Sequence, residues 1–99
     1  MNPIRVEHGG IRVGSDGCSI DGRPVHLAPT ERRLLHFLVA HHGKPLSAYE
    51  IIWSVWPKTV DPKTVSTYCN RVRSVLRREK RGHLLKTVRG YGYCFGGEV

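Results

Sequence analysis

Residues 61–78, DPKTVSTYCNRVRSVLRR, decide the fold of this chain, because they carry the clearest helical pattern in its 99 residues. Asp61 is a good N-cap, and Pro62 suits a first helical position. The apolar side chains then recur at helical spacing: Val65, Tyr68, Cys69, Val72, Val75 and Leu76. The intervening positions are polar or basic, so the stretch predicts an amphipathic helix over about 62–80, which Gly82 ends.

Two shorter helices are predicted before this one. The first begins at Pro29 and stops at Gly43. Its apolar face follows the helical spacing of Leu35, Leu38, Val39 and His42. Ser47 and Glu50 have the spacing of a capping box that opens the second helix, and Pro57 prevents that helix from continuing. Its shared apolar side consists of Ala48, Ile51, Ile52 and Val55.

Short β-favouring runs flank the helical region. Glycines and Asp-Gly dipeptides separate the runs at 4–6, 11–13, 18–20 and 24–27, which predicts a small antiparallel sheet. Two further runs around Arg89-Gly90 predict a closing hairpin. The expected class is α+β, in a single domain over 1–99. Its parts are an N-terminal sheet at about 4–27, three helices within about 29–81 and a hairpin at about 84–96.

The charge of the chain points to a polyanionic partner. Sixteen Lys and Arg residues stand against eight Asp and Glu, which gives a formal net charge of +8 and a pI near 9.9. From Lys58 to Arg89, only Asp61 and Glu79 are acidic. Such a local field attracts nucleic acid or an anionic membrane surface. The alternative is a basic face that is merely solvated.

Several other classes of function find no support in the sequence. Three widely spaced cysteines predict a reduced compartment without disulfides, and no apolar run or leader predicts a membrane or secreted protein. We therefore expect a cytoplasmic protein. His36, His41 and His42 do not share a helix face, and no catalytic motif is present, so we expect no metal, no cofactor and no enzyme. Trp53 and Trp56 are predicted to pack in the core rather than to stack on single strands.

A short helix that leads through a turn into a long basic helix is typical of helix-turn-helix proteins. In these proteins the second helix of the pair lies in the major groove of double-stranded DNA. Lys and Arg on such a helix neutralise phosphates. Thr67, Asn70 and Arg71 can meet base edges, since asparagine pairs with adenine and arginine with guanine.

Five sequence motifs resemble those of a known family. They are Leu27-Ala28-Pro29-Thr30-Glu31, Val55-Trp56, Thr64-Val65, Arg71-Val72-Arg73 and Thr87-Val88-Arg89-Gly90-Tyr91-Gly92-Tyr93. In order and spacing they resemble the OmpR/PhoB-type winged-helix domain, the effector module of many bacterial two-component response regulators. The resemblance runs from about Val13 to Phe95. It implies a winged helix-turn-helix that regulates transcription, with its third helix in the major groove and Arg89 in the minor groove.

The resemblance and the polar face of the third helix together give the candidate contacts with DNA. They are Lys63, Ser66, Thr67, Asn70, Arg71, Arg73, Ser74, Arg77, Arg78, Thr87, Arg89 and Tyr91. The resemblance also implies a domain that is monomeric alone and pairs head to tail on tandem half-sites. In this family the loop before the third helix can also touch RNA polymerase, which the resemblance makes a possible partner.

The chain departs from the family pattern at three points. Asn70 stands where the family often has an arginine, and the loop at 57–59 looks shorter than usual. We expect no receiver domain within these 99 residues, and therefore either the output domain of a response regulator or a free-standing relative. The alternative to DNA binding is a protein–protein module whose basic face meets an acidic partner. Structured RNA is disfavoured, because its narrow major groove does not admit a helix.

Overall fold

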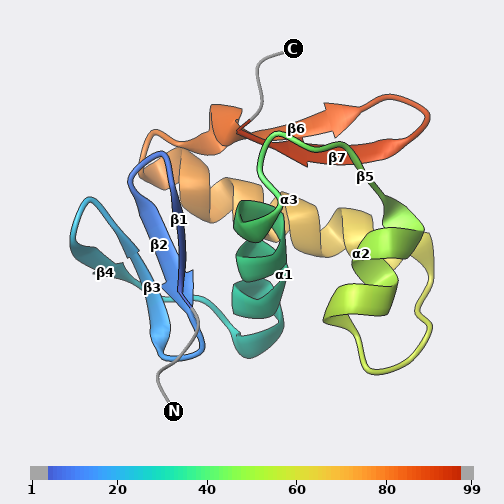
Figure 1. The fold of residues 1–99 in the computed structure, drawn as a ribbon, viewed down its shortest axis with the longest axis horizontal. Coiled ribbons are helices and arrows are strands. Elements are labelled where there is room, and N and C mark those ends of the chain that lie inside the picture. The colour runs from blue at the N-terminus through green and yellow to red at the C-terminus, as the bar shows by residue number, and fades with distance from the viewer. Residues whose placement is uncertain (1–4, 97–99) are drawn as a thin grey trace.

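The computed structural model describes residues 5–96 (Figure 1). The elements follow one another as β1 (Val6–His8), β2 (Ile11–Gly14), β3 (Gly17–Ile20), β4 (Arg23–Val25), α1 (Pro29–Ala40), β5 (Leu46–Ser47), α2 (Ala48–Val55), α3 (Pro62–Arg78), a 3-10 turn (Gly82–Leu84), β6 (Leu85–Val88) and β7 (Gly92–Phe95). In Figure 1 the strands β1–β4 lie to the left of α1, and the β6–β7 hairpin lies at the top of the view, above the helices. The predicted α+β class is confirmed.

The N-terminal sheet consists of hairpins joined by tight turns. It is antiparallel in the order β1-β2-β3-β4. Ile11 pairs with Ile20, and both side chains enter the core. Asp21 and Gly22 form a two-residue turn with positive φ values of 52° and 82°, as an Asp-Gly hairpin turn requires. Residue 4 of the predicted first strand lies outside the described residues, and β1 extends to His8.

Each helix begins where a carboxylate or hydroxyl accepts a backbone N–H that the first turn leaves without a partner. In α1, Glu31 accepts from the N–H three residues before it (3.0 Å). In α2, Ser47 and Glu50 make both bonds of the predicted capping box, at 3.1 and 3.0 Å. In α3, Asp61 accepts from the Lys63 N–H (2.8 Å). The predicted starts of all three helices are confirmed within a residue.

The core lies where the inner faces of the helices meet the two sheets. Its side chains from α1 are Leu34, Leu35, Leu38 and Val39, from α2 Ile51, Ile52 and Val55, and from α3 Val65, Cys69, Val72 and Leu76. Phe95 of β7 is fully buried among them. His42, predicted on the apolar face of α1, is exposed instead, because the helix ends at Ala40.

The buried cysteines serve as apolar side chains. Cys18, Cys69 and Cys94 carry no disulfide. Burial raises the pKa of the Cys69 thiol to about 12 and that of Cys18 to about 11. Both thiols are therefore protonated at neutral pH and pack as small hydrophobic groups.

The C-terminal hairpin gains a third strand that the sequence did not predict. The second sheet has the order β5-β7-β6, with Leu46 opposite Tyr93 and Ser47 opposite Gly92. A Cβ at Gly92 would collide with the carbonyl oxygen of Leu46, so the close approach of β5 requires glycine there. Two residues carry no detectable periodicity, which is why β5 was missed.

The prediction that Gly82 ends α3 is wrong. The helix ends earlier, and Lys80 adopts a left-handed φ of 60°. The Arg81 N–H donates to the Leu76 carbonyl (2.7 Å), and the Lys80 N–H donates to the Arg77 carbonyl (3.0 Å). This pair of bonds is the Schellman motif of a helix C-terminus. A lysine thus occupies a position that is more often glycine, and Gly82 begins the 3-10 turn.

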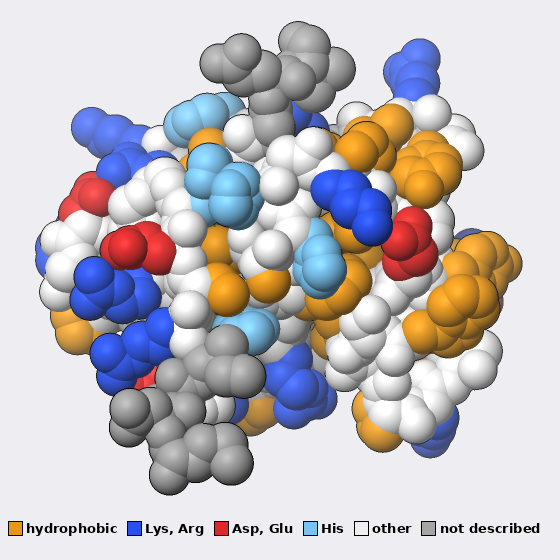
Figure 2. Space-filling model, viewed as in Figure 1, with side chains coloured by type: hydrophobic (Ala, Val, Ile, Leu, Met, Phe, Trp, Pro, Cys, Tyr) orange, Lys and Arg blue, Asp and Glu red, His pale blue; other side chains and the backbone are white. Residues whose placement is uncertain are grey.

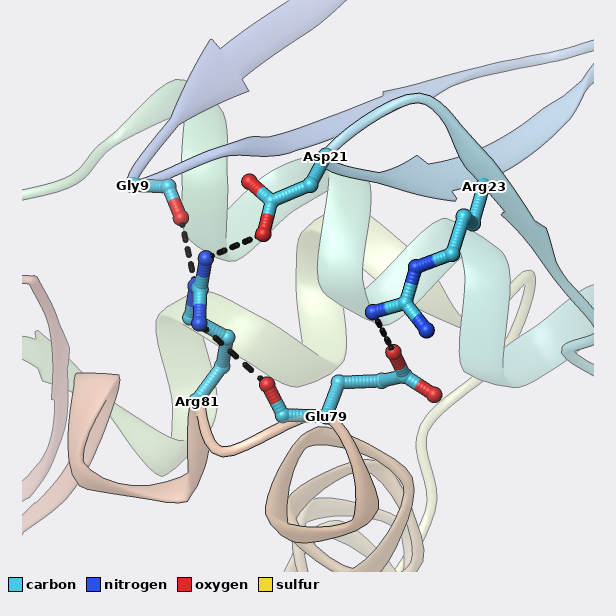
Figure 3. A network of polar contacts seen from close by, with 5 residues as sticks. All are labelled: Gly9, Asp21, Arg23, Glu79 and Arg81. Carbon is cyan, nitrogen blue, oxygen red and sulfur yellow. Dashed lines mark hydrogen bonds and ion pairs between the residues drawn. The ribbon is translucent and has the colours of Figure 1, made fainter.

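The end of α3 is joined to the N-terminal sheet by polar contacts (Figure 3). The Arg81 side chain donates to Asp21 (2.5 Å), to the Gly9 carbonyl (3.0 Å) and to the Glu79 carbonyl (3.2 Å). Arg23 forms an ion pair with the Glu79 carboxylate (2.6 Å). Since these groups are partly exposed, each ion pair contributes at most about 1 kcal/mol. Together they fix the direction of the sheet relative to α3.

The prediction that both tryptophans pack in the core is wrong for Trp53. Trp56 is half-buried against Tyr68, at 5.5 Å between ring centroids. Trp53 is 71% exposed and lies beside the exposed Tyr49. Each helical residue turns by about 100°, so Trp53 points away from the side of α2 on which Ile51 is buried. Figure 2 shows hydrophobic side chains gathered over α2.

The left-handed lysine gives a first prediction. A residue with a Cβ is strained in that region, whereas glycine is not. We expect Lys80→Gly to raise the free energy of unfolding by about 0.5–1 kcal/mol and the Tm by roughly 2–8 °C, measured by thermal and urea denaturation. Lys80→Ala is the matched control, because it removes the same charge but keeps the Cβ. Equal stabilities of the two variants would contradict the assignment of strain to the backbone.

Candidate nucleic-acid interface

The outward face of α3 is set by its buried face. Val65, Cys69, Val72 and Leu76 are fully buried at spacings of four, three and four residues. The side chains between them therefore point to solvent. The exposed predicted contacts on this face are Lys63, Ser66, Thr67, Asn70, Arg71, Ser74, Arg77 and Arg78. No acidic residue lies between the N-cap Asp61 and Glu79 beyond the last turn, so α3 places only neutral and basic side chains on this face.

The first half of α3 offers hydroxyl groups whose hydrogen bonds are partly used within the chain. The Thr67 hydroxyl donates to the Lys63 carbonyl (3.0 Å), so its lone pairs are the part that remains for a ligand. The Ser66 hydroxyl lies 3.1 Å from the Tyr93 hydroxyl of β7. Tyr93 is half-buried, and this contact joins the start of α3 to the C-terminal sheet.

Arg71 is held over an aromatic ring. Its guanidinium lies 4.8 Å from the centroid of the Tyr68 ring, within the range of a cation–π interaction. The Tyr68 ring in turn packs edge-on against Trp56. Because Trp56 supports the Tyr68 ring and this ring supports Arg71, the exposed Arg71 head has a preferred direction away from the core. This order suits a side chain that must present its five N–H donors at one place.

Arg73 connects α3 to the hairpin. Its Nε donates to the Leu85 carbonyl (3.2 Å), its Nη2 to the Thr87 hydroxyl (3.0 Å) and its Nη1 to the Asn70 Oδ1 (3.2 Å). The side chain is half-buried, unlike the other predicted arginines of the helix. The structure thus brings Arg73, Asn70 and Thr87 together in one network, although Thr87 is 14 residues away in sequence.

The tip of the β6–β7 hairpin, residues 89–91, carries Arg89, which is exposed. Val88 pairs with Gly92, and the Tyr91 N–H donates to the Val88 carbonyl (3.0 Å). Tyr91 is 52% exposed and its hydroxyl donates to Glu50 at the start of α2 (3.3 Å). The tip is therefore fastened to the capping box of α2, and Arg89 points into solvent.

A groove runs between the second half of α3 and β6. It is lined by Arg73, Arg77, Lys80, Gly82, His83, Leu85, Lys86 and Thr87. Three basic side chains of this lining, those of Lys80, His83 and Lys86, were not among the predicted contacts. The signal that could have found them is the cluster of basic residues on both sides of Gly82. The groove extends the basic surface from α3 to the hairpin.

Comparison with known proteins assigns this architecture to a family. The model of a family described as "Transcriptional regulatory protein, C terminal" matches residues 22–95. The chain belongs to this family. The match covers all three helices and the C-terminal hairpin. The predicted OmpR/PhoB type and the winged helix-turn-helix class are therefore confirmed, and the β6–β7 hairpin is the wing.

Curated relatives of this transcriptional-regulator family are longer than the chain. The phosphate regulon transcriptional regulatory protein PhoB of Pseudomonas aeruginosa is 35% identical over 94 residues, which are 91% of this chain and 41% of that protein. The response regulator ArlR of Staphylococcus saprophyticus is 33% identical over 88 residues, 85% of this chain and 40% of that protein. The chain thus spans about two fifths of the length of these two relatives.

Solved structures of the family have the same fold. The DNA-binding domain of CpxR from Escherichia coli superposes with a TM-score of 0.81 at 27% identity, over 97% of this chain and 99% of that one. The DNA-binding domain of the response regulator AdeR, solved in complex with an intercistronic region, superposes with a TM-score of 0.86 at 20% identity. The superposition covers 93% of this chain and 99% of that one. The second likeness is one of fold alone.

Other kinds of site are not assembled in residues 5–96 of this winged helix. No group of three or more His, Cys, Asp or Glu side chains among them is placed to hold a metal ion. None of the helices in that range combines the length and the apolar character needed to cross a membrane.

The contact between the wing and α2 gives a second prediction. Chiefly the Ser47 N–H, and to a smaller extent the Tyr91 hydroxyl, hold the pKa of Glu50 below its usual 4.5. A lowered pKa in the folded state stabilises the fold above pH 4.5, and this contribution is lost as the pH falls through the lowered value. Urea denaturation at pH 7 and pH 3 should therefore show a smaller loss of stability for Glu50→Gln than for the wild type.

Glutamine keeps an acceptor for the Ser47 N–H but does not titrate. The Glu50→Gln variant therefore removes the effect of ionisation and keeps the capping hydrogen bond. Tyr91→Phe removes only the hydroxyl of the wing and should give an intermediate result. An identical pH dependence for all three proteins would show that Glu50 does not couple the wing to α2.

Proposed function

We propose that this winged helix binds double-stranded DNA at specific sequences and thereby regulates transcription. The observation that carries the proposal is the exposed face of α3, which lacks acidic residues and continues through Arg73 into the wing. In this arrangement α3 lies in the major groove, and Arg89 at the wing tip enters the adjacent minor groove. The 17 residues of α3 form a cylinder about 26 Å long that the major groove admits.

The candidate contacts divide by their chemistry into two groups. Lys63, Arg77 and Arg78 lie toward the ends of α3 and are proposed to neutralise phosphates, which supply affinity but little specificity. Base edges are read by the central residues of the face, Asn70 and Arg71 among them. The remaining proposed contacts are Ser66, Thr67, Arg73, Ser74, Thr87, Arg89 and Tyr91.

The basic groove between α3 and β6 adds a proposed path for one phosphate strand. Arg77 and Lys80 line its helix side, and Lys86 lies on β6. A strand that left the major groove toward the wing tip would cross this groove. We include its basic residues in the phosphate-contacting surface for that reason.

The larger assembly is proposed from the family. Since the chain spans about two fifths of its response-regulator relatives, we propose that residues 1–99 act as one output domain. Such a domain would be monomeric alone and pair head to tail on tandem half-sites. We propose a site for contact with RNA polymerase at the loop before α3, residues 56–61, and we place the protein in the cytoplasm. We propose no catalytic role.

The proposal is tested first by the salt dependence of binding. If about six basic side chains neutralise phosphates, the slope of log K against log salt should be near −5. Fluorescence anisotropy with duplex DNA from an in-vitro selection, scrambled duplex DNA, duplex RNA and an acidic protein competitor measures it. Preference for the selected duplex with that slope is expected. A slope shallower than about −2, or equal displacement by the acidic protein, would favour the protein–protein alternative.

A second test concerns Arg89. The negative potential of the minor groove is strongest where the groove is narrow, as in A·T-rich DNA. Arg89→Ala should therefore lower affinity more on sites whose flank at the wing is A·T-rich than on sites with a G·C flank. The fold should be unchanged, because the Arg89 side chain is exposed. An equal loss on both flanks would make Arg89 a phosphate contact, and no loss would remove the wing from the interface.

A further inference from the structure

We propose that Asn70 selects guanine through its amide N–H groups, because Arg73 holds its amide oxygen. The inference rests on the proposed binding of DNA by α3 and names what one position of that helix reads. It differs from the sequence-based expectation that Asn70 pairs with adenine. Arg73 is a positioning residue in this account, and Asn70 makes the contact.

The direction of the Asn70 amide follows from the chemistry of its neighbour. A guanidinium has five N–H donors and no acceptor. The amide atom that faces the Arg73 Nη1 at 3.2 Å must therefore be the oxygen. The opposite orientation would place two donors against each other. The amide nitrogen consequently points away from Arg73.

The Arg73 guanidinium is itself fixed from two further sides. The Leu85 carbonyl accepts from its Nε, and the Thr87 hydroxyl accepts from its Nη2. Both acceptors belong to β6, which pairs with β7 along its whole length. Arg73 is also half-buried, so it loses less freedom on binding than an exposed arginine. The wing thus determines which atom of Asn70 faces outward.

The Asn70 side chain presents donors to the surrounding solvent. Asn70 is exposed on the outward face of α3. Its amide oxygen accepts from Arg73 Nη1, which leaves the N–H groups on the other side of the amide. The positive Arg73 lies beside it. Together the two side chains form a small surface that offers N–H groups and positive charge.

Guanine fits this surface better than the other bases. Its major-groove edge carries two acceptors, N7 and O6, whereas adenine carries one acceptor and the N6 donor. An asparagine that reads adenine needs its oxygen for that N6 donor. Here Arg73 uses one of the two lone pairs of that oxygen, and its positive charge repels a further donor. Thymine offers the single acceptor O4, and cytosine offers only the N4 donor. We therefore expect the highest affinity when guanine is at this position and the lowest when cytosine is there.

The experiment starts with in-vitro selection of duplex DNA by the wild type and by Asn70→Ala. The base pair whose preference disappears in Asn70→Ala is the position that Asn70 reads. Affinities are then measured on duplexes with each base there, and with 7-deazaguanine, which lacks the N7 acceptor. We expect adenine to bind about ten-fold more weakly than guanine, and 7-deazaguanine to bind more weakly than guanine.

Two variants test the role of Arg73. Asn70→Asp keeps the shape and the bond to Arg73, so the wing stays attached, but it offers only acceptors; preference should move from guanine toward cytosine. Arg73→Ala releases the amide oxygen, so the affinity for duplexes with adenine at this position should rise relative to those with guanine. Arg33→Ala removes an exposed arginine of α1, far along the sequence from this network, and should leave the base preference unchanged.

Each alternative result has a definite meaning. A preference for adenine at the Asn70 position, or the same guanine preference in Arg73→Ala, would overturn the inference. So would specific binding in which Asn70→Ala changes no base preference, because Asn70 would then contact a phosphate; the proposed function would survive these three results. Binding without any sequence preference and with a shallow salt slope would remove the proposed function itself.

Discussion

The burial of four side chains on the inner face of α3 fixes where every other side chain of that helix points. Val65, Cys69, Val72 and Leu76 are fully buried against α1 and its neighbours. Burial of one such side chain contributes roughly 1.5–3 kcal/mol. Rotation of α3 toward the next residue would replace these side chains by the polar or charged ones of Ser66, Asn70, Arg73 and Arg77. The outward face is therefore as well determined as the core, and the positions that can touch DNA follow from it.

Contacts between α3, the two sheets and α2 hold the wing in a fixed position relative to α3. Arg81 joins the end of α3 to the N-terminal sheet, and Arg73 joins its middle to β6. The wing tip is fastened to α2 through Tyr91 and Glu50. Each contact is modest by itself, since the groups are partly exposed. Their joint effect is to hold α3 and the wing at one spacing, which a duplex with fixed groove widths requires.

The sequence predicted the parts of the structure that depend on local patterns. Helix starts depend on residues within one turn, so the motifs at Ser47 and Asp61 were sufficient to predict them. The regularly spaced apolar residues from Val65 to Leu76 located α3. The wrong predictions concern positions at which the local sequence pattern gives no signal or the wrong one. Trp53 was assigned to the apolar side of its helix, although its angular position on α2 is outward. Lys80 ends a helix at a position where glycine is more common.

The candidate contacts illustrate the same division. Which residues of α3 are exposed follows from its period, but what they do depends on partners far away in the sequence. Arg73 was expected to act like the other arginines of the helix, and nothing in the sequence signals that it bonds to Leu85 and Thr87. That long-range contact also changes the expected chemistry of Asn70.

The central claim is that α3 and the wing form one binding surface while the exposed aromatic side of α2 and the N-terminal sheet lie outside it. Titration of the ¹⁵N-labelled chain with a selected duplex, followed by amide and indole chemical shifts, tests this most directly. The account predicts that the largest shifts fall at residues 63–80, 83 and 86–91. The Trp53 indole N–H and the amides of 6–25 should change little. Largest shifts at Trp53 or in the N-terminal sheet would contradict it.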